Sequence, residues 1–145
     1  MWLEVCSGGW AWADALGWVY WNFRPPYTLY NAKVSAQFIT YGFVGTWFSS
    51  AHLYFKLEVL DSGKSVEDHE WFGNWWGGEI PRDETHTINF GTMYSSTIYI
   101  IKATIRIHCE NSAFVDLESH GTKPIMAKVD YECYGRVAKI VVEAP

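Results

Sequence analysis

The sequence predicts an all-β fold, an antiparallel sandwich of two sheets with a jelly-roll-like arrangement, and three observations lead to this prediction. Apolar and polar residues alternate with a period of two along many segments. Signals for helices are nearly absent, and turn-forming residues separate the alternating segments. Because each strand has one apolar face, either two sheets must face each other or one sheet must close. A closed antiparallel β-barrel is therefore the fallback.

Three segments show the clearest alternation and are expected to form long strands: residues 34–38, 53–59 and 97–109. In the third, Ile101, Ile105 and Ile107 would point inward, while Lys102 and Arg106 would face water. Shorter strands are expected at residues 17–23, 85–90, 113–118, 125–131 and 136–143. Turn-forming residues at 24–26, 61–63, 110–112, 120–122 and 134–135 would separate these strands.

The length and composition fit a single domain covering residues 1–145, because a chain of 145 residues can bury a core of useful size. Its 9 Trp, 9 Tyr and 8 Phe residues argue against disorder, which requires few aromatic residues. The net charge is −5, and no basic run marks a nucleic-acid surface. Nucleic acid is therefore not an expected partner. No secretory signal and no membrane-spanning segment is recognised, so a membrane is not an expected partner either.

The acidic charge is concentrated in residues 61–84, which are predicted to form an ordered, Trp-rich loop. This segment contains seven Asp and Glu residues but only Lys64 and Arg82 as bases, so it accounts for the whole net charge. It shows no strand pattern and is longer than an ordinary connection, which is typical of a functional loop. Its large aromatic residues are Trp71, Phe72, Trp75 and Trp76.

Two interpretations of these aromatic side chains remain open. They could close one end of the sandwich, with the acids solvated around them. Alternatively, exposed indoles could stack on sugar rings or contact a neighbouring subunit, with Glu70, Glu79 and Asp83 as hydrogen-bond acceptors. A divalent cation held by Glu67, Asp68 and Glu70 is less favoured than a solvated acidic face, because no ordered calcium-loop spacing is present. No metal site is therefore predicted.

Residues 1–16 are predicted to form an aromatic N-terminal arm without regular structure. Trp2, Trp10 and Trp12 supply its large apolar side chains, and Ser7 with the two glycines after it would interrupt a strand. Large apolar patches rarely stay exposed on a monomer. The arm should therefore either fold over its own domain or lie on a neighbouring subunit.

The cysteines also allow two interpretations. Cys6, Cys109 and Cys133 are an odd number without metal-ligand spacing, which favours buried thiols. A bridge between Cys109 and Cys133 is the alternative, because both fall late in predicted strands.

No catalytic set is recognised in the sequence. The motifs of serine hydrolases, phosphate-binding loops and zinc proteases are missing. His86 and His108 fall at strand positions that should face solvent. Acidic residues at positions 116 and 118, and at 130 and 132, share strand faces, but such alternation is ordinary on a solvated strand face. The prediction is a non-enzymatic protein without a cofactor.

These observations favour a structural or assembly protein, a homo-oligomeric β-sandwich building block such as a virion component (capsid-decoration or tail) or a filament subunit. Its expected partners are copies of itself or another structural protein. The aromatic content motivates this expectation, because it exceeds what one small core can absorb. The alternative is a carbohydrate-binding β-sandwich module that uses the loop tryptophans to bind a glycan, and an enzyme acting on glycans ranks third.

Overall fold

The structure is a computed structural model that describes residues 3–6, 12–41, 43–73, 77–79, 81–117 and 134–145. Within these residues the chain forms strands in two antiparallel sheets and no helix. The predicted β-sandwich is therefore confirmed, and the fallback of a closed barrel is not formed. The strands are β1 (Leu3–Cys6), β2 (Trp12–Phe23), β3 (Leu29–Tyr41), β4 (Phe43–Val59), β5 (Lys64–Phe72), β6 (Gly77–Glu79), β7 (Arg82–Met93), β8 (Tyr99–Leu117) and β9 (Tyr134–Glu143).

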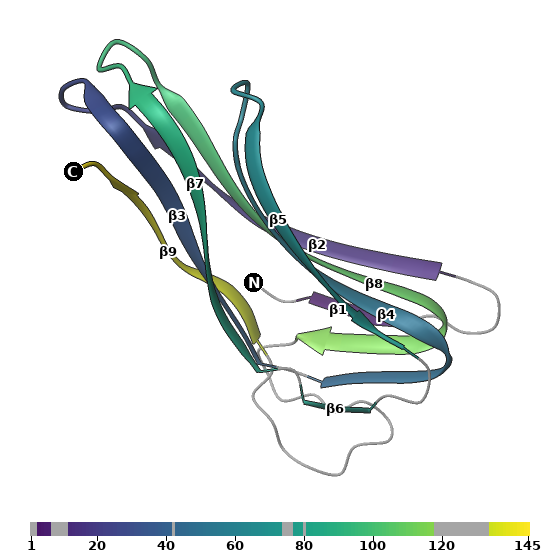
Figure 1. The fold of residues 1–145 in the computed structure, drawn as a ribbon. Coiled ribbons are helices and arrows are strands. Elements are labelled where there is room, and N and C mark those ends of the chain that lie inside the picture. The colour runs from purple at the N-terminus through teal and green to yellow at the C-terminus, as the bar shows by residue number, and fades with distance from the viewer. Residues whose placement is uncertain (1–2, 7–11, 42, 74–76, 80, 118–133) are drawn as a thin grey trace.

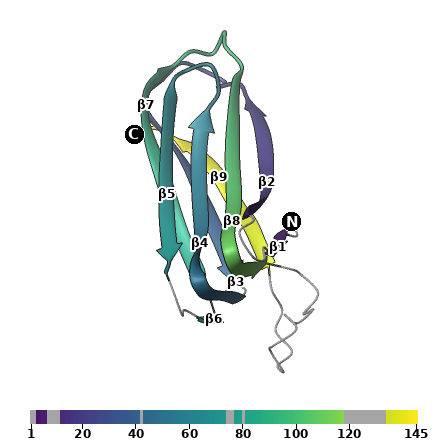
Figure 2. The same ribbon diagram turned by 90° about the vertical axis from the view of Figure 1, so that its right-hand side faces the viewer.

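The two sheets differ in size. In the larger sheet, β8 lies between β4 on one side and both β1 and β2 on the other, and β4 also pairs with β5 and β6. In the smaller sheet, β3 lies between β7 and β9. Figure 1 shows the two sheets facing each other, and Figure 2 shows the larger sheet in front, from β5 at one edge to β2 at the other.

The strand pairing is nested in sequence. The hairpin β4–β5 is enclosed by the pair β3–β7, which is enclosed in turn by the pair β2–β8. The middle pair lies in the smaller sheet and the other two lie in the larger one. This is the pattern of one long hairpin rolled into two layers, so the arrangement is jelly-roll-like, as the sequence predicts.

The core lies between the sheets and uses the faces that alternation predicts. Phe38 of β3 packs against Phe55 of β4 across the two sheets, with ring centroids 5.2 Å apart. Alternate residues of the three longest predicted segments are buried, which confirms their inward faces: Val34, Ala36, Phe38, Leu53, Phe55, Leu57, Val59, Ile101, Ala103, Ile105 and Ile107.

The turn predicted at residues 110–112 is wrong, because β8 runs through it from Tyr99 to Leu117. Opposite this point β4 contains one extra residue between the pairs Trp47–Ser112 and Ser50–Glu110. Such a bulge bends the paired strands without ending the ladder. Tyr134 and the glycine after it also begin β9 rather than a turn. The strand predicted at 125–131 and the turn at 120–122 lie outside the described residues.

Residues 61–84 are mostly strand rather than loop, which corrects the sequence prediction. The hairpin turn after Val59 is followed directly by β5, and the same segment contains β6 and the start of β7. The alternation is hidden in β5 because this edge strand carries polar residues on both faces. Val66 and Phe72 still lie on its inner face, opposite Leu57 and Ala51 of β4.

The N-terminal arm also contains regular structure, contrary to the prediction. β1 pairs with the end of β8, and β2 begins at Trp12 rather than at residue 17. Both strands pair with β8, so the described backbone of the arm extends the larger sheet of its own domain. Backbone pairing with a long neighbouring strand explains why an irregular-looking sequence is extended here.

Two further findings concern the cysteines and membranes. Cys109 is buried in the core, whereas Cys133 lies outside the described residues, so a bridge between them stays a prediction. Among the described residues there is no helix of the length and apolar character that a membrane span requires.

Candidate functional site

The aromatic residues predicted to bind a partner are placed in different environments. Trp71 lies on the outer face of β5 with 62% of its surface exposed. Phe72, the next residue, points into the core and is buried, so it is not available to a partner. The structure describes only the backbone of Trp12, at the start of β2, opposite Glu110. The remaining predicted residues, Trp2, Trp10, Trp75 and Trp76, lie outside the described part of the chain.

The acids predicted to accompany these indoles do not surround Trp71. Glu70 lies on the opposite face of β5 and forms a bidentate ion pair with Arg82 of β7. Asp83 lies on the outer face of the smaller sheet, where it accepts a hydrogen bond of 2.6 Å from Gln37 Nε2. Only the backbone of Glu79 is described, in β6. The predicted set is therefore not one site.

A surface that the sequence did not single out follows strand β2. Five of its large apolar side chains are between 37% and 52% exposed. Two of them, Val19 and Trp21, lie on the face that continues the core. The other three, Leu16, Trp18 and Tyr20, lie on the outer face, with Trp18 and Tyr20 beside the Lys102 ammonium at 5.6 and 5.5 Å.

The free edge of β2 is also unusual in its backbone. Among the described strands β2 pairs only with β8, through twelve consecutive residues without a bulge. Its single charged residue is Asp14, whereas β5, β7 and β9 each carry several charges. Proteins normally protect edge strands with charges, prolines or bulges, because exposed edges pair with other chains. The β2 edge lacks these protections.

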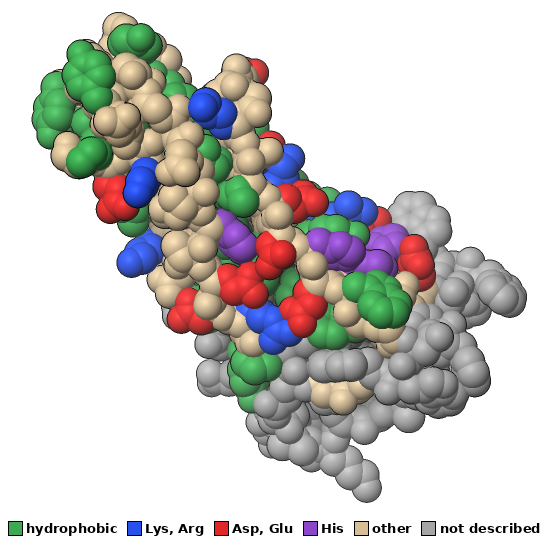
Figure 3. Space-filling view, viewed as in Figure 1, with side chains coloured by type: hydrophobic (Ala, Val, Ile, Leu, Met, Phe, Trp, Pro, Cys, Tyr) green, Lys and Arg blue, Asp and Glu red, His purple; other side chains and the backbone are tan. Residues whose placement is uncertain are grey.

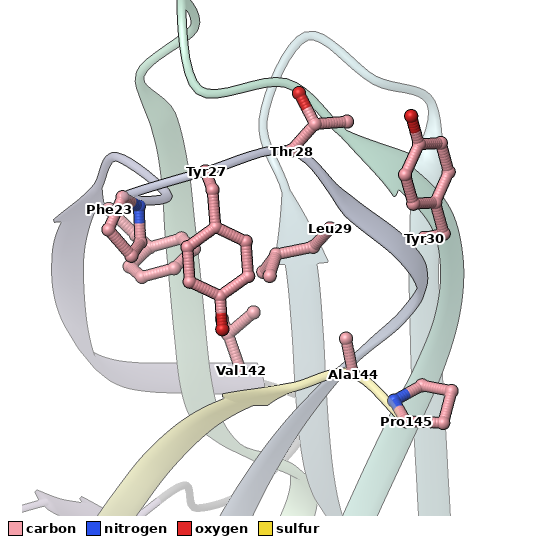
Figure 4. Close-up of a pocket in the computed structure, with 9 residues that line it drawn as sticks. Phe23, Tyr27, Thr28, Leu29, Tyr30, Val142, Ala144 and Pro145 are labelled. Atoms are coloured by element: carbon pink, nitrogen blue, oxygen red, sulfur yellow. The ribbon is translucent and has the colours of Figure 1, made fainter.

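A second apolar region lies at the tip of the sandwich, near the end of β2, where the β2–β3 and β7–β8 connections meet (Figure 1). Tyr27, Tyr30, Tyr94 and Ile98 are each more than half exposed there. A hollow of about 420 Å³ opens beside them, lined by Phe23, Leu29 and Val142 among others, and the Tyr27 ring projects into it (Figure 4). The hollow is lined by aromatic and aliphatic groups together with the hydroxyls of Tyr27, Thr28 and Tyr30, and by no charged side chain.

Histidines gather on the outer face of the larger sheet. His52 Nδ1 and His69 Nε2 lie 2.7 Å apart, so one ring donates a hydrogen bond to the other. His108 Nδ1 lies 2.9 Å from Asp14, and its Nε2 lies 3.2 Å from Glu110. His108 therefore lies on the outer face as predicted, but its side chain is only 14% exposed and has a carboxylate on each side.

The pKa values in this cluster shift for identifiable reasons. Burial lowers the pKa of His52, because the charged ring loses hydration, and the neighbouring His69 and His108 lower it further. Hydrogen bonds from His108 and Ser50 lower the pKa of Glu110, because they favour its ionised form.

A hollow of about 240 Å³ lies next to this cluster on the same face. Tyr54 forms part of its wall, with its ring stacked on His69 at 4.3 Å and covered by the Arg106 guanidinium at 5.1 Å. Glu58 lies between Lys56 at 2.9 Å and Lys102 at 3.8 Å. The charged groups of this hollow therefore pair with one another, and the Tyr54 ring is covered by His69 and Arg106.

A third polar cluster lies between the two sheets, where β5 and β7 approach each other. The cluster consists of Asp68 of β5 with Glu84 and His86 of β7. One carboxylate oxygen from each acid and one ring nitrogen of His86 all lie within 4.8 Å of one another. His86 Nε2 lies 3.2 Å from Glu84 Oε2. Figure 3 shows acidic side chains gathered on this side of the molecule. Burial raises the pKa of Glu84, and the charge of Asp68 raises it further.

The position of His86 corrects one prediction. His86 was expected to face solvent, but it pairs with buried Ala36 and packs on the rings of Phe38 and Phe55 at 5.5 and 6.2 Å. The less favoured cation group of Glu67, Asp68 and Glu70 does not share one face of β5, because Glu67 lies on the outer face. The signal that could have located His86 is its position two residues before buried Ile88.

The two acidic pairs on predicted strand faces fall on residues whose side chains the structure does not describe. The side chain at position 116 is not described, and positions 118, 130 and 132 lie outside the described residues.

Comparison of the chain with models of known protein families finds no match, and a search of curated proteins likewise finds no similar sequence.

Proposed function

We propose that the protein is a non-enzymatic structural subunit that assembles with copies of itself through the free edge of β2. The observation that supports this proposal most strongly is the combination of an unprotected edge with exposed apolar side chains on both faces of the same strand. A glycan site would need exposed rings on one face, whereas strand addition buries both faces.

Pairing of two edge strands supplies main-chain hydrogen bonds, and the flanking side chains supply the buried apolar area. Two copies of β2 related by a twofold axis would pair antiparallel and form one continuous sheet. Trp18 and Tyr20 would then meet their counterparts on the outer face, and Trp21 would extend the core across the interface. Stable interfaces bury roughly 1,200–2,000 Å² in total, so the exposed residues at the tip would add to the contact.

The test compares the mass of the wild type with that of an edge variant by light scattering over a range of concentrations. Leu16→Glu combined with Trp18→Glu places charges on the outer face of β2, beside Arg106 and Lys102, where folding should tolerate them. We expect a dimer or larger species for the wild type and a monomer for the variant, because a charged edge resists pairing.

Trp71→Glu is the matched control, because it removes an exposed indole from the opposite edge of the same sheet. Its mass should equal that of the wild type. A wild type that stays monomeric at high micromolar concentration, or an edge variant that still assembles, would refute the proposal.

A carbohydrate-binding module is the second candidate, and the exposure of Trp71 favours it. Its indole lies flat over Gly73, because an added Cβ at that glycine would meet the ring. A flat exposed indole can stack on a sugar ring. Oligosaccharides should then change the tryptophan fluorescence of the wild type but not of Trp71→Ala, and a broad panel without any change would remove this candidate.

A further inference from the structure

The cluster between β5 and β7 has the composition of a metal centre. We propose that Asp68, Glu84 and His86 bind a divalent transition-metal ion of the Zn²⁺ type, which links the two sheets at their open edge. The site is separate from the β2 edge and does not depend on the proposed assembly.

Each ligand is delivered by strand geometry. Glu84 and His86 are two residues apart on β7, so both point to the inner face. Asp68 lies on the inner face of β5, where it is opposite buried Phe55 of β4. β5 and β7 are edge strands of opposite sheets, and the side chains of the two strands meet across the gap. The three ligands thus come from both sheets, at an edge where β5 and β7 form no backbone pairing with each other.

The orientation of His86 is held by packing. Its ring lies against Phe38 and Phe55, and its Nε2 is directed to Glu84 at 3.2 Å. Imidazole nitrogen with two carboxylate oxygens is a ligand set for zinc, which commonly takes three protein ligands and leaves one position for water. Tetrahedral zinc places its ligand atoms about 3.3 Å apart, so a group within 4.8 Å needs only small side-chain movements.

The charge around the cluster supports a dication. Asp68, Glu70 and Glu84 are three acids on the facing inner surfaces, and Arg82 is the base among them. Arg82 is engaged by Glu70 in a bidentate ion pair and lies 4.0 Å from Glu84. Counted as ionised, these three acids and Arg82 carry two negative charges, which equals the charge of one Zn²⁺ ion. Lys64, the other base on the inner face of β5, lies over the Phe90 ring. Calcium is a poorer fit, because it prefers six to eight oxygen ligands.

The experiment uses the full chain after treatment with a chelator, titrated with Zn²⁺ and followed by calorimetry and thermal unfolding. We expect one equivalent to bind and the Tm to rise by roughly 5–10 °C at a hundredfold excess over Kd. Glu84→Gln and His86→Gln should each weaken binding at least tenfold. Co²⁺ in place of Zn²⁺ should show the visible absorption of a low-symmetry site in the wild type, and this absorption should be lost in both variants.

Two controls separate this site from others. Asp83→Asn changes the neighbouring acid on the outer face of β7, and His69→Gln changes the histidine cluster of the larger sheet. Both should bind Zn²⁺ like the wild type. Circular dichroism of the metal-free variants establishes that they are folded. The proposal fails if Zn²⁺ stabilises Glu84→Gln as much as the wild type, if His69→Gln abolishes binding, or if millimolar Zn²⁺ has no effect.

Discussion

The face of the strand on which a residue lies decides which other side chains it can contact. Glu70 and Trp71 are neighbours in sequence, yet one forms an ion pair between the sheets and the other lies exposed on the outer surface. A shift of one residue in a strand reverses the side-chain direction, so such pairs cannot share a site. The outer face instead brings together His52 and His69 from neighbouring strands.

The lowered pKa of His52 makes a prediction about pH. An unperturbed histidine titrates near pH 6.5, so the unfolded chain takes up a proton at His52 before the folded chain does. Stability from this residue is therefore complete above about pH 6.5 and is lost as the pH falls towards its lowered pKa. Urea midpoints measured at about pH 7.5 and about pH 5.5 should fall less in His52→Gln than in the wild type. Equal losses in the two proteins would contradict this.

At the scale of the element, the edge strands differ in how well they are protected against pairing with another chain. β5 and β7 carry charges, whereas β2 presents aromatic rings and an unbulged backbone. The pairing of β3 with β7 is irregular, because it contains two register shifts next to Ala32. Asn31 has a φ of 53° and Gly91 a φ of 97°, so both strands carry left-handed residues at this irregularity.

Gly91→Ala should therefore destabilise the protein through its backbone rather than through a clash. No atom lies within 4 Å of an added Cβ, but an L side chain rarely adopts the φ of this position. The expected loss is about 1–2 kcal/mol in the free energy of unfolding, measured with urea. Gly77→Ala is the matched control, because the space there is also open and its φ is not positive. If both substitutions cost the same, the backbone explanation is wrong.

At the scale of the whole molecule, the two sheets are held together by the apolar faces that they share. Phe38 and Phe55 form a contact across the middle of the sandwich, flanked by buried residues of β4 and β8. At the open edge between β5 and β7, polar groups replace this apolar packing. The sandwich therefore combines a continuous core with an edge at which charges connect the layers.

Phe38→Ala should reduce the free energy of unfolding by about 3–5 kcal/mol, because a fully buried ring leaves a cavity between the sheets. Tyr27→Ala removes a ring of similar size at the exposed tip and should leave the stability nearly unchanged. Urea denaturation followed by fluorescence measures both. A loss below about 1 kcal/mol for Phe38→Ala would mean that the core collapses around the missing ring.

The sequence alone determined the two-layer β fold and the inward faces of the long strands. Leu53, Phe55 and Leu57 alternate with polar residues, and burial of that face is a local consequence of strand geometry. Alternation could not identify β5, because an edge strand tolerates polar residues on both faces.

The tertiary structure decided which residues lie next to each other across strands and across the two sheets. The edge of β2 is free because no second described strand pairs with it, and Val19 and Trp21 on its inner face are each 37% exposed. Asp68 and His86 come together because the hairpin after β4 returns along one sheet while β7 crosses to the other. Pairing partners and register depend on contacts between distant parts of the chain, which a local pattern does not contain.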